Sequence, residues 1–120
     1  MRTDDQLRIE QRTEGIVIVL GLRGELDIAT AARLPQALGA VARSGTLHLV
    51  VDLQAVTVLD SVGVRSLLHT RRWMFNRGGE ARFVCDGGPA ARTIELMGLR
   101  DALGVSADYA SAVAGFDVTP

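Results

Sequence analysis

The sequence predicts a single α/β domain built on a mixed sheet of four to five strands packed with about four helices. Strand-like and helix-like segments alternate along the chain, which is typical of α/β folds. Residues 46–53, TLHLVVDL, are apolar on both faces, as in an interior strand of a parallel sheet. Helix-length connections between the later strands indicate right-handed parallel crossovers. The 120 residues, 48% of them hydrophobic, suit one domain over 1–120, with a core over about 6–116 and short polar tails.

The first half of the chain is predicted to form three strands and one helix. The strands, each rich in apolar or alternating residues, are 7–14, 16–24 and 46–53. About one residue separates the first two, which predicts a hairpin. A helix precedes the third strand, with Thr30 as a plausible N-cap and the Ser44–Gly45 pair as its end. Its core-facing positions recur at helical spacing: Leu34, Leu38 and Val41. We expect residues 54–60 to form a loop.

The second half of the chain begins with a helix from Ser61 to about Arg77, which Gly78–Gly79 ends. Its predicted core face consists of the apolar residues at helical spacing, namely Val64, Leu67, Leu68, Met74 and Phe75. A strand over 80–85 and a helix over 89–97 follow, with Pro89 at the first helical position. A short strand and a final helix capped by Asp108 complete the chain.

Composition argues against several classes of protein. The net charge is −1, with thirteen Arg, no Lys and fourteen acidic residues, so nothing in the overall charge attracts nucleic acid or anionic lipid. Cys85 is the only cysteine, which excludes an intramolecular disulfide and fits a reducing compartment. The polar N-terminal residues do not resemble a signal peptide, and no apolar run approaches the ~20 residues that cross a bilayer. We therefore expect a soluble cytoplasmic protein.

The stretch VLDSVGVRSLL, residues 58–68, carries the strongest candidate for a functional residue. Ser61 stands where an apolar run gives way to a helical pattern, so it is either a helix cap or an accessible hydroxyl. Asp60 competes for the capping position. If Asp60 caps the helix, Ser61 is free at its first residue, at the carboxyl edge of the sheet where α/β proteins usually place function.

Ser61 lacks the surroundings of a catalytic nucleophile. The G-x-S-x-G elbow is absent, and His69 lies about 12 Å along the helix at 1.5 Å per residue. His48 falls inside the interior strand, where a satisfied core residue is the simpler interpretation. Neither a phosphate-binding glycine motif nor metal-ligand spacing is present. The sequence therefore predicts no enzyme, no cofactor and no metal.

The outer face of the predicted 61–77 helix is a candidate partner surface. Opposite the predicted core positions lie Val62, Arg65, Ser66, His69 and Trp73. An exposed Val beside Arg, with a Trp further along, suits protein recognition. The alternative is that Trp73 folds back onto the domain. The basic segment 71–77 is interpreted as a solvated helix end rather than a nucleic-acid site.

Three stretches resemble the STAS domain family, in particular the bacterial anti-sigma factor antagonists. LRGELDIATAARLPQAL resembles the family's Gly-Glu-Leu-Asp segment, which enters the first helix at Asp27. LVVDLQAVTVLDSVGVRSLL resembles the strand, short loop and Asp-Ser-Ser/Thr-Gly signature, here Asp60 to Gly63. GGEARFVCDGGPAARTIELMGLRDALGV resembles the strand and helix that follow. Together they cover nearly the whole chain in order, and they imply a STAS-like fold.

The resemblance implies a phosphorylation switch. In the family, the Ser after the motif Asp, here Ser61, is phosphorylated by a cognate anti-sigma factor that is itself a protein kinase. The unphosphorylated antagonist binds that anti-sigma factor and frees the sigma factor, and a metal-dependent serine/threonine phosphatase resets the cycle. Val62 replaces the family's second hydroxyl residue, which excludes a second phosphorylation there.

The expected partner-binding residues combine the family positions with the outer helix face: Asp27, Asp60, Ser61, Val62, Gly63, Arg65, Ser66 and His69. The alternative function is a STAS-type interaction or scaffold module, in a stress-signalling complex or as a transport accessory, without a phosphorylation cycle. We expect a monomer or a weak dimer in either case, with no direct contact to nucleic acid or membrane.

Overall fold

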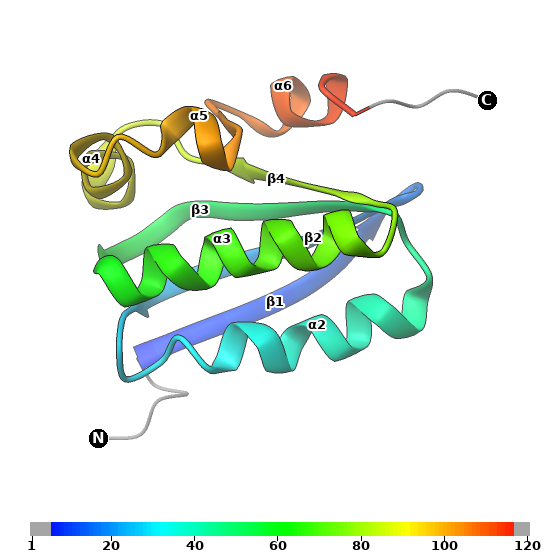
Figure 1. The fold of residues 1–120 in the computed structure, drawn as a ribbon, viewed down its shortest axis with the longest axis horizontal. Helices are drawn as coiled ribbons and strands as arrows, with labels where there is room; N and C mark the ends of the chain where they lie inside the picture. Colours follow the sequence, from blue (N-terminus) through cyan, green and yellow to red (C-terminus); the bar gives the residue numbers. More distant parts are fainter. Residues whose placement is uncertain (1–5, 117–120) are drawn as a thin grey trace.

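A five-stranded sheet in the order β1-β2-β3-β4-β5 forms the centre of the computed structural model, which describes residues 6–116 (Figure 1). The strands are β1 Leu7–Glu14, β2 Val17–Leu26, β3 His48–Leu59, β4 Glu80–Val84 and β5 Val105–Ser106. β1 and β2 form the predicted antiparallel hairpin, and every later pair is parallel. The predicted mixed sheet is thus confirmed. The predicted polar tails lie largely outside the described residues.

The helices are α2 Arg33–Ser44, α3 Ser61–Asn76, α4 Gly88–Leu96, α5 Arg100–Leu103 and α6 Tyr109–Ala114. The short α5 was not predicted. Gly45 ends α2 with a φ of 74°, and Asp108 caps α6 by accepting a hydrogen bond from the Ser111 N–H at 2.7 Å. Both predicted helix boundaries are confirmed. Across residues 6–116, no helix combines the length and apolar character needed to span a membrane.

The two faces of the sheet are covered by different helices because successive strand residues point to opposite sides. One face carries Ile18, Leu20, Leu49 and Val51, which belong to the larger core cluster with α2, α3 and α4. In Figure 1, α2 and α3 run across this face one below the other. The other face carries a smaller cluster capped by α6: Val17, Val19, Val50, Val84, Ala112 and Phe116. Both faces of β3 are therefore covered, as its apolar sequence predicts.

The expected loop over 54–60 is wrong, because β3 continues to Leu59. This half of β3 pairs with the end of β2 across two register shifts: Gly24, between the shifts, lies opposite Val56, and Leu26, beyond both, lies opposite Leu59. Val56 and Leu59 are buried, whereas Thr57 and Val58 between them are exposed. The prediction failed because the irregular pairing interrupts the alternation by which a half-buried strand is recognised.

Thr30 does not cap α2, which begins at Arg33 and has Ala32 at the N-cap position without a side-chain hydrogen bond. Instead Thr30 is fully buried in the loop between β2 and α2. Its hydroxyl donates to the Glu25 carbonyl oxygen at 2.7 Å and accepts from the Asp27 N–H at 3.0 Å. The hydroxyl therefore organises this loop rather than the helix start.

The buried face of α3 is rotated relative to the prediction. Val64, Leu67 and Met74 are buried as expected, but Leu68 is only partly buried and Phe75 is 76% exposed, so the core assignment of Phe75 is wrong. Small residues take part of the buried face instead: Gly63, Ser66 and Thr70. Because these small residues take up part of the covered face, Phe75 faces outward and Leu68 lies at the margin of the core.

Hydrogen bonds make the burial of the two hydroxyl groups possible. The Ser66 hydroxyl donates to the Ala31 carbonyl oxygen at 3.2 Å, and the Thr70 hydroxyl donates to the Ser66 carbonyl oxygen at 3.0 Å. A buried hydroxyl without such a partner would cost ~1–3 kcal/mol. The prediction that Ser66 lies on the outer face is therefore wrong: its side chain joins α3 to the segment before α2.

The two edges of the sheet differ in length. β1 exposes Arg8, Glu10, Arg12 and Glu14, which alternate in charge along the strand, and Arg12 pairs with Glu14 at 3.1 Å. β5 has only two residues. Charged side chains and short strands are the usual means by which natural sheets keep their edges from pairing with other chains.

Candidate functional site

Asp60 and Ser61 share the start of α3 as one of the two sequence interpretations predicts. Asp60 is the N-cap, and its Oδ1 accepts a hydrogen bond from the Gly63 N–H at 2.8 Å. Ser61 is the first helical residue and is exposed. Its hydroxyl makes no hydrogen bond with any residue in the range 6–116. Because Asp60 occupies the capping position, the Ser61 hydroxyl remains accessible.

The second carboxylate oxygen of Asp60 connects α3 to the β2–α2 loop. Oδ2 accepts from the Ile28 N–H at 3.0 Å, so one side chain holds two segments that are 32 residues apart. Asp27 bonds within its own loop, where its Oδ1 accepts from the Ala29 N–H at 3.0 Å. The backbone of Ile28, a residue that is 76% exposed, is thereby held against Asp60, the residue before Ser61. Sequence reasoning missed Ile28, although an isoleucine within a polar loop was a signal for it.

Two substitutions of Asp60 should distinguish the contributions of its two hydrogen bonds to the stability of the fold. Asp60→Ala loses the cap and the bond to the loop, and we expect a loss of about 2–3 kcal/mol in the free energy of unfolding. Asp60→Asn can still cap the helix, but its amide nitrogen cannot accept from Ile28, so we expect about half that loss. Urea unfolding followed by circular dichroism measures both. Wild-type stability in Asp60→Ala would contradict this role.

The remaining predicted residues divide into an exposed and a buried group. Arg65 and His69 are exposed and Val62 is half-buried, whereas Gly63 and Ser66 are buried and present no side chain to a partner. Together with Ser61 and Ile28, the first three form the accessible surface around the start of α3. We call this surface, made of Ile28, Ser61, Val62, Arg65 and His69, the α3 docking face.

Trp73 does not extend the α3 docking face. It is half-buried, packs against the larger core cluster, and lies under the Arg77 guanidinium at 4.7 Å from the ring centre. The alternative that Trp73 folds back onto the domain is thus confirmed. Trp73 therefore makes its contacts within the molecule and does not serve as an exposed aromatic residue for a partner.

Gly63 brings the start of α3 close to the end of β2. A Cβ atom at this position would lie 2.8 Å from Leu59 Cδ1 and 3.0 Å from the Leu26 carbonyl carbon, and closer still to the Leu26 carbonyl oxygen. The Asp60 N–H donates to the same oxygen at 3.4 Å. The absence of a side chain at Gly63 therefore allows the first turn of α3, which carries Ser61, to pack directly against the end of β2.

The other reactive side chains lie away from the α3 docking face or are buried. The imidazole of His48 is half-buried and meets the ring of Phe116 edge-on, with 5.0 Å between ring centres. Burial raises the pKa of the Cys85 thiol, which keeps it protonated and weakly nucleophilic at neutral pH. Over residues 6–116, no three His, Cys, Asp or Glu side chains gather as metal ligands.

The electrostatics at Ser61 favour an added anion. The first turn of α3 contains no acidic side chain, and its unpaired N–H groups carry the positive end of the helix dipole. An anion at this place is stabilised by about 0.3–1 kcal/mol. Asp60 opposes this with its own negative charge. The site can therefore carry a negatively charged group on Ser61 without a large loss of stability.

Comparisons with known proteins agree with this fold. The family model for the STAS domain matches residues 8–112. The chain therefore belongs to the STAS domain family. This assignment agrees with the resemblance of the Asp60–Gly63 segment and with the mixed sheet that carries it.

Relatives within this family are anti-sigma factor antagonists. The anti-sigma-F factor antagonist RsfB of Mycobacterium tuberculosis is 37% identical over 101 residues, covering 82% of this chain and 80% of RsfB. The anti-sigma-B factor antagonist of Staphylococcus aureus is 27% identical over 100 residues, covering 83% and 93%. The crystal structure of an anti-sigma factor antagonist from Mycobacterium paratuberculosis superposes with a TM-score of 0.81 at 31% identity, covering 93% and 95%.

Proposed function

We propose that this protein is an anti-sigma factor antagonist that is switched by phosphorylation of Ser61. In its unphosphorylated form it binds a cognate anti-sigma factor through the α3 docking face, and the sigma factor is released. The anti-sigma factor is also a serine kinase, and it transfers the γ-phosphoryl group of ATP to the Ser61 hydroxyl. The bond between the β- and γ-phosphates breaks, ADP leaves, and the hydroxyl gives up its proton. The antagonist is thus a substrate and not an enzyme.

The observation that carries this proposal is the division of roles between Asp60 and Ser61. Asp60 satisfies the helix start, which leaves Ser61 exposed and without a hydrogen-bond partner among the described residues. A kinase needs a hydroxyl that it can reach without unfolding its substrate. The sequence similarity to named anti-sigma factor antagonists supports the same function.

The phosphate acceptor can be identified directly. The Ser61→Ala protein serves as bait for the cognate anti-sigma factor, because it should bind without being phosphorylated. The captured factor is then incubated with ATP and the wild-type protein, and we expect peptide mass analysis to find one phosphate, on Ser61. Ser111→Ala, which removes another exposed serine, should still accept it. Phosphate on another residue, with Ser61 unmodified, would disprove the assignment.

Two further parts of the proposal follow from this chemistry. Removal of the phosphate requires a phosphatase, and we propose one of the metal-dependent serine/threonine type. A protein that controls a sigma factor acts where transcription occurs, so we propose that it works in the cytoplasm. A STAS-type scaffold without a phosphorylation cycle would have the same fold, but it would bind its partner equally well after Ser61 is replaced by Asp.

A further inference from the structure

The outward face of α3 continues beyond the α3 docking face as a shallow hollow of about 580 Å³. The residues that line it all belong to α3: Arg65, Leu68, His69, Arg71, Arg72 and Phe75. From Arg65 to Phe75 they span about 15 Å at the helical rise of 1.5 Å per residue. The rotation of α3 that buries Gly63, Ser66 and Thr70 is what turns Leu68 and Phe75 into this surface. We call it the α3 groove.

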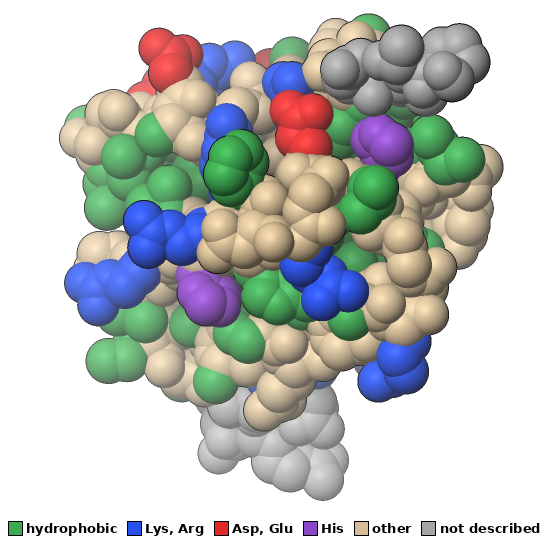
Figure 2. Space-filling model, turned by 45° about the vertical axis from the view of Figure 1, so that its right-hand side comes forward, with side chains coloured by type: hydrophobic (Ala, Val, Ile, Leu, Met, Phe, Trp, Pro, Cys, Tyr) green, Lys and Arg blue, Asp and Glu red, His purple; other side chains and the backbone are tan. Residues whose placement is uncertain are grey.

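The side chains that line the α3 groove carry positive charge. The groove contains three arginines and a histidine, and the whole of α3 lacks Asp and Glu. Glu80, which lines an adjoining hollow with Arg71 and Phe75, is paired with Arg82 at 2.7 Å. Within residues 6–116, Arg65, Arg71 and Arg72 form no ion pair, while other arginines of the chain do. The chain as a whole has a net charge of −1, so this concentration is not a consequence of a basic protein. Figure 2 shows arginines among hydrophobic side chains across the middle of this side, with the acidic side chains in its upper part.

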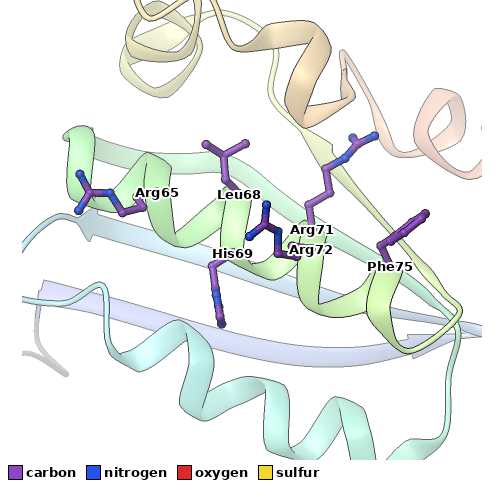
Figure 3. A pocket seen from close by; sticks show the side chains of 6 residues that line it. All are labelled: Arg65, Leu68, His69, Arg71, Arg72 and Phe75. Carbon is purple, nitrogen blue, oxygen red and sulfur yellow. The ribbon is translucent and has the colours of Figure 1, made fainter.

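The groove also contains apolar surface between its charges. Phe75 is 76% exposed and Leu68 partly so. In Figure 3, Leu68, Arg71 and Phe75 project to one side of α3, and His69 projects to the other, toward α2. The guanidinium of Arg71 lies against Gly104 at the end of α5, where a Cβ atom would come within 2.6 Å of it. The half-buried Arg71 side chain thus lies along one side of the groove. Arg65 and Arg72 are exposed, and their guanidinium groups can reach a ligand.

We propose that the α3 groove binds an acidic segment of a protein partner, one that carries at least two carboxylates around an aliphatic or aromatic side chain. Carboxylates complement Arg65 and Arg72, since a guanidinium can bind a carboxylate with two parallel hydrogen bonds. The apolar side chain covers Phe75 and Leu68, which are otherwise in water. A bilayer fits less well, because the surface offers only two apolar side chains for insertion.

This proposal stands apart from the phosphorylation of Ser61. It concerns a recognition surface that begins about one helical turn from the hydroxyl, at Arg65, and ends about four turns away, at Phe75. This surface shares Arg65 and His69 with the α3 docking face, but binding there needs neither a kinase nor ATP. It also rests on particular arginines, whereas the proposed switch rests on Asp60 and Ser61. A segment bound here could belong to any partner that also meets the α3 docking face, and it would add affinity by lengthening the contact along one helix.

The test uses a displayed library of random 12-residue peptides, selected on the full chain. Peptides that also bind the double variant Arg65→Gln/Arg72→Gln are removed by counter-selection. We expect the enriched sequences to share two or more Asp or Glu around an apolar residue. In fluorescence anisotropy, the best peptide should bind the double variant at least tenfold more weakly, which corresponds to about 1.4 kcal/mol. Its affinity should also fall with rising salt.

Two control variants assign the binding to the groove. Arg92→Gln removes the same charge from an exposed position on α4, and we expect less than a twofold change in affinity. Phe75→Ala should weaken binding severalfold while α3 remains folded, because Phe75 is exposed and Ala favours helix. Enriched peptides without acidic residues, or no enrichment at all, would overturn the proposal. So would phosphatidylserine vesicles that bind through Arg65 and Arg72 when no peptide does.

Discussion

Ser61→Asp is expected to weaken binding of the anti-sigma factor more than a hundredfold, without unfolding the protein. The new carboxylate would lie beside Asp60 at the centre of the α3 docking face. Burying an unpaired charge against a partner costs several kcal/mol, and ~3 kcal/mol is more than a hundredfold in affinity. Phosphorylation adds about −1.5 to −2 charges and should act more strongly still. Calorimetric titration with the captured anti-sigma factor measures the change.

Two matched variants separate charge from size at Ser61. Ser61→Asn has nearly the shape of Asp without its charge, so we expect it to retain affinity within about tenfold of the wild type. Ser61→Ala should bind as well as the wild type. The urea midpoint of Ser61→Asp should stay near that of the wild type, because the helix N-terminus tolerates an anion. Equal weakening by Asn and Asp would show that fit, and not charge, governs the interface.

Gly63→Ala is expected to cause the largest loss of stability, about 3 kcal/mol or more. The added methyl group would overlap the Leu26 carbonyl and Leu59, and the carbonyl is backbone that cannot rotate away. Overpacking of this kind typically costs ~1–3 kcal/mol, with more where the structure cannot yield. In a domain of this size the melting temperature should fall by about 10 °C or more. Thermal unfolding followed by circular dichroism tests the prediction.

A second glycine provides the control for Gly63→Ala. Gly39 lies inside α2, where an added Cβ atom would have only the flexible end of Arg43 nearby, at 3.5 Å. Gly39→Ala should therefore stabilise the protein by about 0.5–1 kcal/mol through higher helix propensity. We thus expect the two substitutions to change stability in opposite directions. A change in the same direction would contradict the explanation that Gly63 is required by the close approach of α3 to β2.

Local chemistry made much of this fold predictable from sequence. The apolar strand segments, the glycine that ends α2 and the aspartates at helix starts act within a few residues, and each was confirmed. The position of Ser61 belongs to this group, because it depends on which of two adjacent residues caps α3. Its exposure could be predicted once Asp60 was recognised as the better cap.

Contacts between distant segments explain what could not be predicted. Ser66 is buried because its hydroxyl reaches the Ala31 carbonyl, 35 positions earlier, and no periodicity in α3 signals that partner. The same packing exposes Phe75, which a pattern of apolar spacing assigns to the core. Ile28 was missed for a related reason: its place beside Asp60 depends on the hydrogen bond from its N–H to the carboxylate of that residue. The errors at Ser66 and Phe75 concern which face of α3 the rest of the chain covers.

The character of the sheet edges bears on how such a protein behaves in a crowded solution. The charged side chains of β1 and the two-residue length of β5 both oppose the addition of a strand from another chain. Growth of sheets from one molecule to the next, the first step toward insoluble fibrils, is therefore disfavoured at both ends. Recognition is left to the helical side of the molecule, where contacts form and dissociate without any strand having to be exchanged.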